Sequence, residues 1–437
     1  EGTRFFGCHS AARWAWRKDC AAVNFRLEQS MLIELKIKNC FSIQDEQTLS
    51  FVASDDTMIR HNTFQAANLT LLKSVAVYGA NAAGKTNLVR IISIMKHLIL
   101  ESTERKIGDN LQITPFLLGN DKNNPSELEI AFVIDDVKYR YGFSLNRNRF
   151  LEEWLFAYPD NEPQQWFLRC YDANQDKDEF DWSEHFQDET NAQQKTRENV
   201  LFLSAAIKWN NKQLRPIFKW FHNLNISSIM GFYNAKNLSV EMLKDNKINF
   251  LKYIKDVDLD IEDIKIEEKE INMQELPYEL RNMLLDNPEK ISKIDIKTLH
   301  FDQDGNIVEF YIQQESDGTK KFFEFLGPIM DTLENGKILV IDELHNHLHP
   351  MMTKFIIGLF HSKSFNKNNA QLLFTTHETS VLSDEIFRKD QVYFCEKQNK
   401  ATRFYSMSDF NGIKEDWDFE QSYLLGRFGA LPNILQP

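Results

Sequence analysis

The stretch "SVAVYGANAAGKTNLVRIISIMKHLIL", residues 74–100, constrains this chain more than any other. Its first letters are short, apolar and rich in β-formers, as in a strand buried on both faces. Its last sixteen letters carry apolar residues at helical spacing. Between them, Gly79–Asn87 match the pattern G-x-x-x-x-G-K-[ST], which requires this strand-loop-helix context. The chain is therefore expected to contain an α/β unit built around this strand and helix.

The glycine-flanked loop is a candidate phosphate-binding loop. Such a loop lets consecutive backbone N–H groups surround a phosphate, and the following helix adds the partial positive charge of its N-terminus. Lys85 would reach the β- and γ-phosphates of a nucleoside triphosphate, and Thr86 would give its hydroxyl to Mg²⁺. The alternative is a chance match in a turn rich in Ala and Gly. The candidate ATP-binding residues are Gly79, Ala80, Asn81, Ala82, Ala83, Gly84, Lys85, Thr86 and Asn87.

A second buried strand, "ILVIDE", ends in two acidic residues. Asp342 at its end is a candidate Mg²⁺ ligand, acting through water. Glu343 would face the γ-phosphate and orient or deprotonate the attacking water. The plain alternative is a solvated Asp-Glu pair after a strand. Together with the loop, these residues predict an enzyme that hydrolyses ATP.

The residues that follow, "LHNHLHP", have three possible interpretations. Alternate histidines His345, His347 and His349 could converge on a metal, but zinc needs three or four fixed ligands and no Cys or Asp cluster accompanies them. The letters H-N-H resemble a nuclease motif, but that motif needs widely separated residues. The third reading, which we favour, is structural or interface histidines beside the nucleotide.

Two further stretches indicate which kind of ATPase this is. In "QQESDGTKKFFEFL", Ser316 and Gly318 keep the S-x-G core of the signature by which ABC-type ATPases reach a nucleotide held by a second subunit. The alternative for "ESDGT" is a simple helix cap. Downstream, "LLFTTHETSVL" places His377 at the end of a buried strand, where that class keeps a histidine that contacts the γ-phosphate.

The order of elements predicts an interrupted α/β domain. Strand alternation marks residues 33–37, and residues 127–157 read as an antiparallel meander with a turn at Asp135-Asp136. The stretch "TLHFDQDGNIVEFYIQQ" reads as a hairpin with Asp304-Gly305 in the turn, and "ELPYELRNMLL" reads as a helix. The predicted divisions are a leader or non-native extension (1–30), the N-terminal part of the ATPase domain (31–157), a mainly helical insertion (158–300), the C-terminal part (301–405), and a tail packing on it (406–437).

Composition narrows the class of protein. The net charge of −13 gives no global attraction to DNA or to anionic membranes. The five cysteines are scattered and odd in number, which favours a reducing, cytoplasmic setting over a disulfide framework. No apolar run reaches the roughly 18 residues that a membrane span needs.

From Met31 onward the chain resembles the ABC/SMC/RecF-like AAA ATPases of bacterial anti-phage operons. These include the ATPase subunit of the PARIS system, abortive-infection ATPases and retron- or restriction-linked ATPases. The sequence segments on which the resemblance rests are "MLIELKIKNCFSI", "GANAAGKTN", "PFLLG", "LFLSAA", "ESDGTKK", "ILVIDELHNHLHP", "TTHETSVL" and "YLLGRFGALPNI". The signature departs from that of transporters at Glu315, Asp317 and Thr319. No clear counterpart appears for the glutamine that usually couples the nucleotide to the insertion, and Gln112 is only a candidate for it.

The resemblance implies an ABC-type P-loop ATPase head with a mixed sheet, an antiparallel meander and a helical insertion. It implies ATP and Mg²⁺ as cofactors, with a homodimer or higher homo-oligomer formed through an ATP sandwich. It further implies a sensor or scaffold that holds and releases a separately encoded toxin or nuclease when a phage-encoded trigger is sensed. The alternative is a RecF/SMC-like DNA-repair ATPase that binds DNA directly, which the acidic charge disfavours. An OLD-type nuclease is disfavoured because only about sixty residues follow His377, against the roughly 100 that an appended nuclease domain would need.

Overall fold

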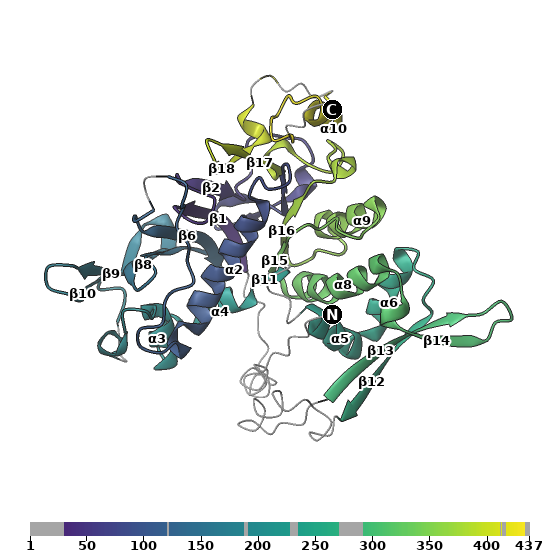
Figure 1. Cartoon of the computed structure of the whole chain (residues 1–437), viewed down its shortest axis with the longest axis horizontal. Helices are drawn as coiled ribbons and strands as arrows, with labels where there is room; N and C mark the ends of the chain where they lie inside the picture. The colour runs from purple at the N-terminus through teal and green to yellow at the C-terminus, as the bar shows by residue number, and fades with distance from the viewer. Residues whose placement is uncertain are drawn as a thin grey trace. The chain divides into compact units, whose positions relative to one another are not determined.

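The computed structural model describes residues 30–119, 122–187, 191–227, 235–270, 292–410, 412 and 417–432. Residues 1–29 of the predicted leader lie outside this range. The described residues divide into two compact units. A large unit takes in those from 30 to 227 and from 331 to 432, and a small unit takes in those from 235 to 330. Each unit is described separately below, with its elements labelled as in Figure 1.

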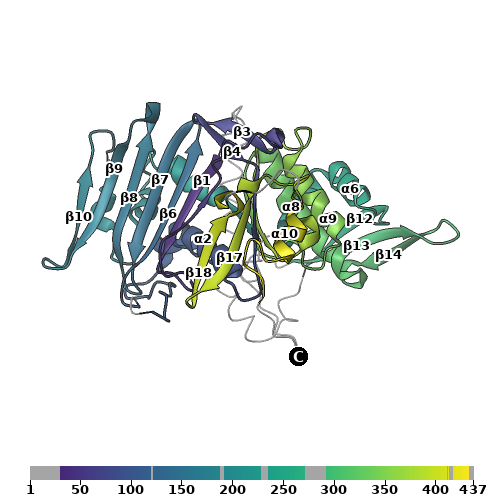
Figure 2. The ribbon, with the colours of Figure 1, turned by 90° about the horizontal axis from the view of Figure 1, so that it is seen from above.

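The large unit contains a seven-stranded antiparallel sheet, in the order β10-β9-β8-β7-β6-β1-β2 (Figure 2). Its strands are β1 (Ser30–Lys38), β2 (Gln47–Ser50), β6 (Ser126–Ile134), β7 (Val137–Leu145), β8 (Phe150–Tyr158), β9 (Gln164–Asp172) and β10 (Lys177–Trp182). The predicted meander is confirmed by β6, β7 and β8. Asp135 and Asp136 form its first turn, with φ of 47° and 67°, a left-handed conformation that Asp tolerates better than most residues.

A second sheet of six strands follows the order β11-β15-β16-β5-β17-β18. It is parallel except for the last pair. The strands are β5 (Ser74–Tyr78), β11 (Asn225–Ser227), β15 (Ile338–Ile341), β16 (Gln371–Thr376), β17 (Val392–Gln398) and β18 (Ala401–Ser406). Every residue of β5, β15 and β16 is buried, as expected for strands of a parallel sheet covered on both faces.

The helix α2 (Lys85–Glu101) joins the two sheets into one core. Its buried residues, among them Leu88, Ile92 and Met95, pack in a single apolar cluster with Leu35 of the antiparallel sheet and Val77 of the parallel sheet. The helices α3 (Phe202–Lys208) and α4 (Arg215–Asn223) belong to the same core, and α9 (Pro350–His361) contacts β5 and β16. The hairpin of β3 (Thr63–Ala66) and β4 (Leu69–Leu72) and the C-terminal α10 (Phe419–Leu424) complete the unit.

The small unit is a helical layer with a three-stranded sheet. It contains α5 (Ala235–Asp245), α6 (Lys247–Asp256), β12 (Asp263–Glu270), β13 (Ser292–Phe301) and β14 (Ile307–Tyr311). The helix α8 (Asp317–Asn335) begins in this unit and continues past its boundary, which lies between Met330 and Asp331. The predicted hairpin with a turn at Asp304-Gly305 is confirmed by the pairing of β13 with β14.

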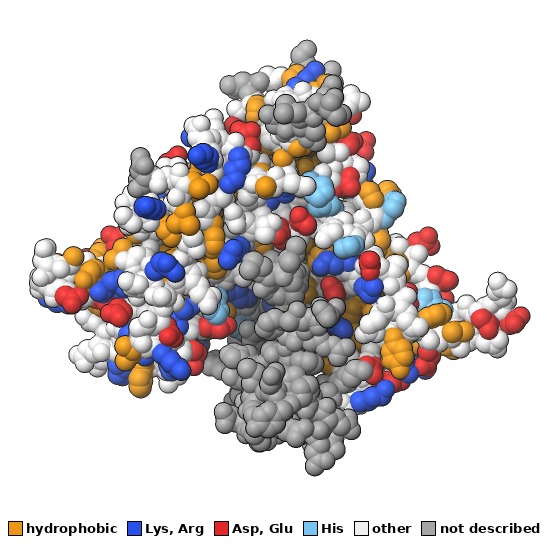
Figure 3. Space-filling view, in the orientation of Figure 1, with side chains coloured by type: hydrophobic (Ala, Val, Ile, Leu, Met, Phe, Trp, Pro, Cys, Tyr) orange, Lys and Arg blue, Asp and Glu red, His pale blue; other side chains and the backbone are white. Residues whose placement is uncertain are grey.

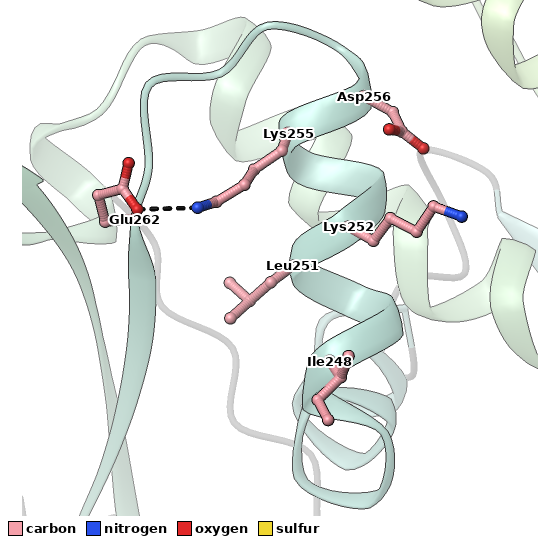
Figure 4. A pocket seen from close by; sticks show the side chains of 6 residues that line it. All are labelled: Ile248, Leu251, Lys252, Lys255, Asp256 and Glu262. Carbon is pink, nitrogen blue, oxygen red and sulfur yellow. Dashed lines mark hydrogen bonds and ion pairs between the residues drawn. The ribbon is translucent and has the colours of Figure 1, made fainter.

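A pocket in the small unit lies beside α6 and is shown in Figure 4. Its lining residues are Ile248, Leu251, Lys252, Lys255, Asp256 and Glu262, and Lys255 pairs with Glu262 at 2.8 Å. None of the predicted site residues lines this pocket.

The prediction for residues 158–300 needs correction. This range was expected to be mainly helical, yet it also holds β9, β10, β11, β12 and most of β13. In β10, "KDEFDW", and β12, "DIKIEEKE", only two residues of each strand are apolar, which is too few to signal a strand clearly. The predicted helix at "ELPYELRNMLL" lies outside the described residues.

The structure also bears on membrane insertion. Across the part of the chain that the structure describes, every helix is too short or too polar to cross a lipid bilayer.

Candidate nucleotide site

The parallel sheet brings the predicted site residues of the large unit to one edge. Strands β15, β16 and β5 are parallel neighbours, so their C-terminal ends meet at the same edge of the sheet. The acidic pair follows β15, His377 follows β16, and the glycine loop follows β5. In open α/β sheets, ligands bind at the carboxyl ends of such strands.

The glycine loop is held in a conformation that excludes larger residues at two positions. Gly84 has φ of 118°, and a Cβ atom there would lie 2.2 Å from Thr402 Oγ1. A Cβ at Gly79 would lie 2.2 Å from the carbonyl oxygen of Cys395. Both glycines of the motif are therefore required by neighbours from β17 and β18 as well as by the loop itself.

Lys85 is buried at the start of α2, with 6% of its surface exposed. Its Nζ donates to the carbonyl oxygens of Gly79 and Ala80, at 2.6 and 3.0 Å. Burial lowers the pKa of Lys85, while Cys395, Glu343 and Asp342 act in the opposite direction. The Lys85 side chain therefore reaches back across the glycine loop, where a phosphate would bind.

Sequence reasoning missed three residues that support the loop: Ser42, Thr402 and Ala430. Thr402 Oγ1 donates to the carbonyl oxygen of Ala83 at 2.7 Å and is hydrogen-bonded to Ser42 Oγ at 2.8 Å. Ser42 Oγ also accepts from Asn87 Nδ2 at 2.7 Å. The Ala80 N–H donates to the carbonyl oxygen of Ala430 at 3.0 Å. These partners are separated from the loop by about 40 to 350 residues of sequence, so no local pattern reveals them.

The two acidic residues are positioned through one hydroxyl. Thr375 Oγ1 donates to Asp342 Oδ1 at 2.6 Å and accepts from the Glu343 N–H at 2.8 Å. Asp342 is 6% exposed, and its Oδ2 has no hydrogen-bond partner among the described residues. Glu343 is less buried and has φ of 52°. A buried carboxylate oxygen without a partner costs free energy unless a ligand satisfies it.

The three alternate histidines do not converge. His349 caps α9, since its Nδ1 accepts from the Met351 N–H at 3.2 Å, and His347 is exposed with φ of 63°. Within the described residues, no group of three or more His, Cys, Asp or Glu side chains is arranged as a metal site. The positions of His347 and His349 do not support the metal reading of this stretch. Figure 3 shows histidine side chains gathered near α9.

His345 instead joins His377. Their Nε2 atoms lie 3.1 Å apart, and His345 Nδ1 lies 3.0 Å from Thr376 Oγ1. Burial, followed by the neighbouring His377, lowers the pKa of His345 to about 4, although Glu378 opposes this shift. His345 is therefore neutral at pH 7.

The predicted signature residues belong to the small unit, and the other predicted site residues belong to the large unit. Ser316 is exposed, and its Oγ accepts from the Thr319 N–H at 3.1 Å at the start of α8. The helix-cap reading of this stretch is thus confirmed, and the serine's role toward a nucleotide stays a prediction. Glu315 accounts for one departure from the transporter signature, because it is hydrogen-bonded to His300 at 2.8 Å and to Thr298, both in β13.

The donor set at the sheet edge fits a magnesium ion. Mg²⁺ prefers hard oxygen ligands. Asp342 offers a buried carboxylate oxygen without a protein partner, and the Thr86 hydroxyl stands on an exposed residue in the first turn of α2. Carboxylate and hydroxyl oxygens are the ligand types the ion takes beside a bound triphosphate.

Comparison with known proteins gives one family match and several distant structural ones. The chain is similar to the SMC head domain from Thermotoga maritima at 12% identity, covering 86% of this chain and 98% of that one with a TM-score of 0.37. It is similar to an Smc head domain with an extended coiled coil, bound to the C-terminal domain of ScpA and derived from Pyrococcus furiosus, at 12% identity, covering 91% and 99% with a TM-score of 0.37. The recombination mediator RecF with ATP matches at 12% identity over 88% and 100%, with a TM-score of 0.31.

No curated protein matches the chain. Residues 74–383 match the family described as "AAA domain, putative AbiEii toxin, Type IV TA system", and this range includes the glycine loop, the acidic pair and His377. The chain therefore belongs to this family of AAA domains.

Proposed function

We propose that this protein binds ATP at the edge of the parallel sheet and hydrolyses it to ADP and phosphate. The observation that carries the proposal is the meeting of a buried lysine, a partnerless carboxylate oxygen and a second acidic residue at the ends of neighbouring parallel strands. Lys85 would exchange its bonds to the loop carbonyls for phosphate oxygens. Glu343 would orient and deprotonate the attacking water, and His377 would contact the γ-phosphate.

Magnesium belongs to this proposal as a cofactor. Thr86 and Asp342 would hold it, Asp342 through the oxygen that lacks a protein partner. When bound, the ion neutralises negative charge on the phosphates. Thr375 keeps the Asp342 carboxylate fixed by its hydrogen bond, so the remaining oxygen is already positioned.

We further propose that two copies sandwich ATP, with Ser316 and Gly318 of one copy facing the glycine loop of the other. Ser316 is exposed at the N-terminus of α8, a helix of 19 residues, and that terminus favours an anionic partner. An exposed serine there can donate its hydroxyl to a phosphate that its own chain does not hold.

The biological role that we propose is a switch in anti-phage defence. The family description refers to a toxin and a toxin-antitoxin system, which supports a separately encoded toxin or nuclease as the partner. ATP binding would hold this effector, and a phage-encoded trigger would release it. Hydrolysis removes the contacts that the protein makes with the γ-phosphate, and this loss can change how the protein grips its effector.

The proposal is tested with three variants of the full chain. Lys85→Ala should abolish measurable ATP binding and hydrolysis, while Glu343→Gln should bind ATP and hydrolyse it at least roughly 100-fold more slowly. Because the Glu343→Gln protein retains its ATP, light scattering should show an ATP-dependent dimer or higher oligomer. Ser316→Arg should bind ATP without associating.

The controls are Lys367→Ala and Glu385→Gln, which change exposed residues of the same types in the large unit. They should behave like the unmodified chain. Full ATP turnover by Lys85→Ala would refute the assignment of the site. A Glu343→Gln protein that stays monomeric with ATP bound would refute the sandwich.

A further inference from the structure

His345 lies beside His377, the proposed γ-phosphate contact. Its two ring nitrogens face different partners: Nδ1 is 3.0 Å from Thr376 Oγ1, and Nε2 is 3.1 Å from His377 Nε2. The rings are 3.9 Å apart between centroids and inclined by 68°. This geometry allows the positions of the protons to be derived.

The derivation begins at Thr376, which is fully buried. Its Oγ1 accepts from the Glu378 N–H at 3.0 Å. Among the described residues, the only other partner of this hydroxyl is His345 Nδ1. A buried hydroxyl donates its proton where it can, so His345 Nδ1 is the acceptor and carries no proton.

The same logic extends to His377. Burial and the neighbouring ring keep the pKa of His345 at about 4, so at pH 7 this neutral ring carries its single proton on Nε2. That proton points at His377 Nε2, 3.1 Å away, which must accept it. A neutral His377 then carries its own proton on Nδ1, and no described protein group accepts from that nitrogen.

We propose that His345 is a positioning residue that sets the orientation and tautomer of His377, so that His377 offers an Nδ1–H donor to the nucleotide. The chain of hydrogen bonds runs from the Glu378 N–H through Thr376 and His345 to His377. This inference rests on the proposed ATP hydrolysis only for its effect on rate, since the proton positions exist with or without turnover. In a neutral imidazole ring, the hydrogen bond made by one nitrogen decides whether the other nitrogen carries the proton.

The rate test uses a pair of variants. His345→Phe keeps a ring of similar size but removes both nitrogens. It should lower kcat by roughly 10-fold or more, by analogy with removal of the hydrogen-bond partner of a metal-ligating histidine. The KM for ATP should change far less, because the proposal places His377, and not His345, against the nucleotide. The side-chain amide of His345→Gln has an oxygen that can accept from Thr376 and an NH₂ group that can donate to His377. This variant should therefore keep most of the rate that His345→Phe loses. The control is His347→Asn, at an exposed left-handed position that Asn tolerates.

A spectroscopic test is independent of turnover. In the full chain labelled with ¹⁵N-histidine, the ring signals of His377 should report a proton on Nδ1, and those of His345 a proton on Nε2. Loss of each signal in His377→Gln and His345→Gln assigns them. In Thr376→Val the His345 tautomer should no longer be fixed, whereas Thr376→Ser should preserve it.

These measurements separate the two claims. If the unmodified chain binds ATP without hydrolysing it, the proposed function is refuted. The ¹⁵N signals of His345 and His377 then still decide whether His345 sets the tautomer of His377. A His377 proton on Nε2 overturns the inference, as does an equal loss of kcat in His345→Phe and His345→Gln.

Discussion

Threonine hydroxyls fix the catalytic candidates at the scale of single residues. Thr375 bonds both acidic residues, Thr376 bonds His345, and Thr402 bonds the glycine loop. A hydroxyl can donate and accept at once, so one buried threonine can hold two groups in a fixed relation. The sequence predicts the charged residues at this site, because phosphate binding, magnesium binding and activation of water each require particular side chains. It does not predict the threonines, whose role depends on which strands are neighbours.

A buried histidine outside the site gives a pH-dependent prediction. His361 is 6% exposed, and its Nε2 lies 2.8 Å from Ser74 Oγ and 3.3 Å from Gln391 Nε2. Burial, helped by His61 and Lys73, lowers its pKa to about 3. The unfolded chain, with an ordinary histidine pKa of about 6.5, binds a proton more readily below that pH. This residue therefore costs the folded state about 1.4 kcal/mol per pH unit as the pH falls from about 6.5 toward 3.

His361→Gln removes the titrating group and keeps an acceptor for Ser74 and Gln391. We expect the free energy of unfolding of this variant to fall less steeply between pH 7 and pH 5 than that of the unmodified chain, as measured by urea unfolding. The exposed His185→Gln controls for the loss of a histidine. Parallel pH profiles for the unmodified and His361→Gln proteins would contradict the prediction.

The helix α8 shows how one element depends on another. Pro328 has no N–H to bond the carbonyl of Glu324, and the Gly327 N–H donates to Ser239 Oγ of α5 at 3.0 Å. Ser239 in turn lies within hydrogen-bond distance of the carbonyl oxygens of Phe323 and Glu324, at 2.7 and 3.1 Å. The α5 serine therefore satisfies the backbone groups that the proline leaves open. A Cβ at Gly327 would lie 2.3 Å from the Ser239 backbone.

Two helical glycines should respond in opposite directions to the same substitution. Gly327→Ala cannot fit without separating α5 from α8, and should lower the free energy of unfolding by about 1–3 kcal/mol or more. Gly358→Ala lies on the exposed side of α9 with no atom within 4 Å, and should raise it by about 0.5–1 kcal/mol. Urea unfolding of both variants checks this. A Gly327→Ala variant at least as stable as the unmodified chain would show that α5 and α8 do not pack as described.

Prediction from sequence succeeded at this scale where periodicity or a motif was strong. The glycine loop, the meander and the β13–β14 hairpin carry clear apolar alternation or turn residues. The strands β9, β10 and β12 were missed for two reasons. β10 and β12 hold only two apolar residues each, and the run Trp166-Phe167-Leu168 in β9 breaks the alternation expected of a strand. The contact between Glu315 and β13 also escaped prediction. It joins a loop to a strand that precedes it by about fifteen residues, and no local rule connects them.

Charge distribution separates the proposed switch from a DNA-binding ATPase at the scale of the whole molecule. The net charge is −13. Lysines that line the sheet of the small unit are already paired with acids: Lys265 with Glu309 at 2.6 Å, and Lys297 with Glu267 at 2.6 Å. Such pairs leave little positive charge on that sheet to displace counterions from DNA.

We therefore expect the full chain to bind a duplex of about 30 base pairs more weakly than roughly 10 µM at about 150 mM salt. The measurement is fluorescence anisotropy with ATP present, made on the unmodified chain and on Glu343→Gln, because an ATP-bound dimer would form whatever joint surface two copies create. Lys85→Ala serves as the nucleotide-free control. Tight binding that weakens steeply with added salt, and that appears only in Glu343→Gln with ATP, would favour a repair ATPase over a switch that holds a protein effector.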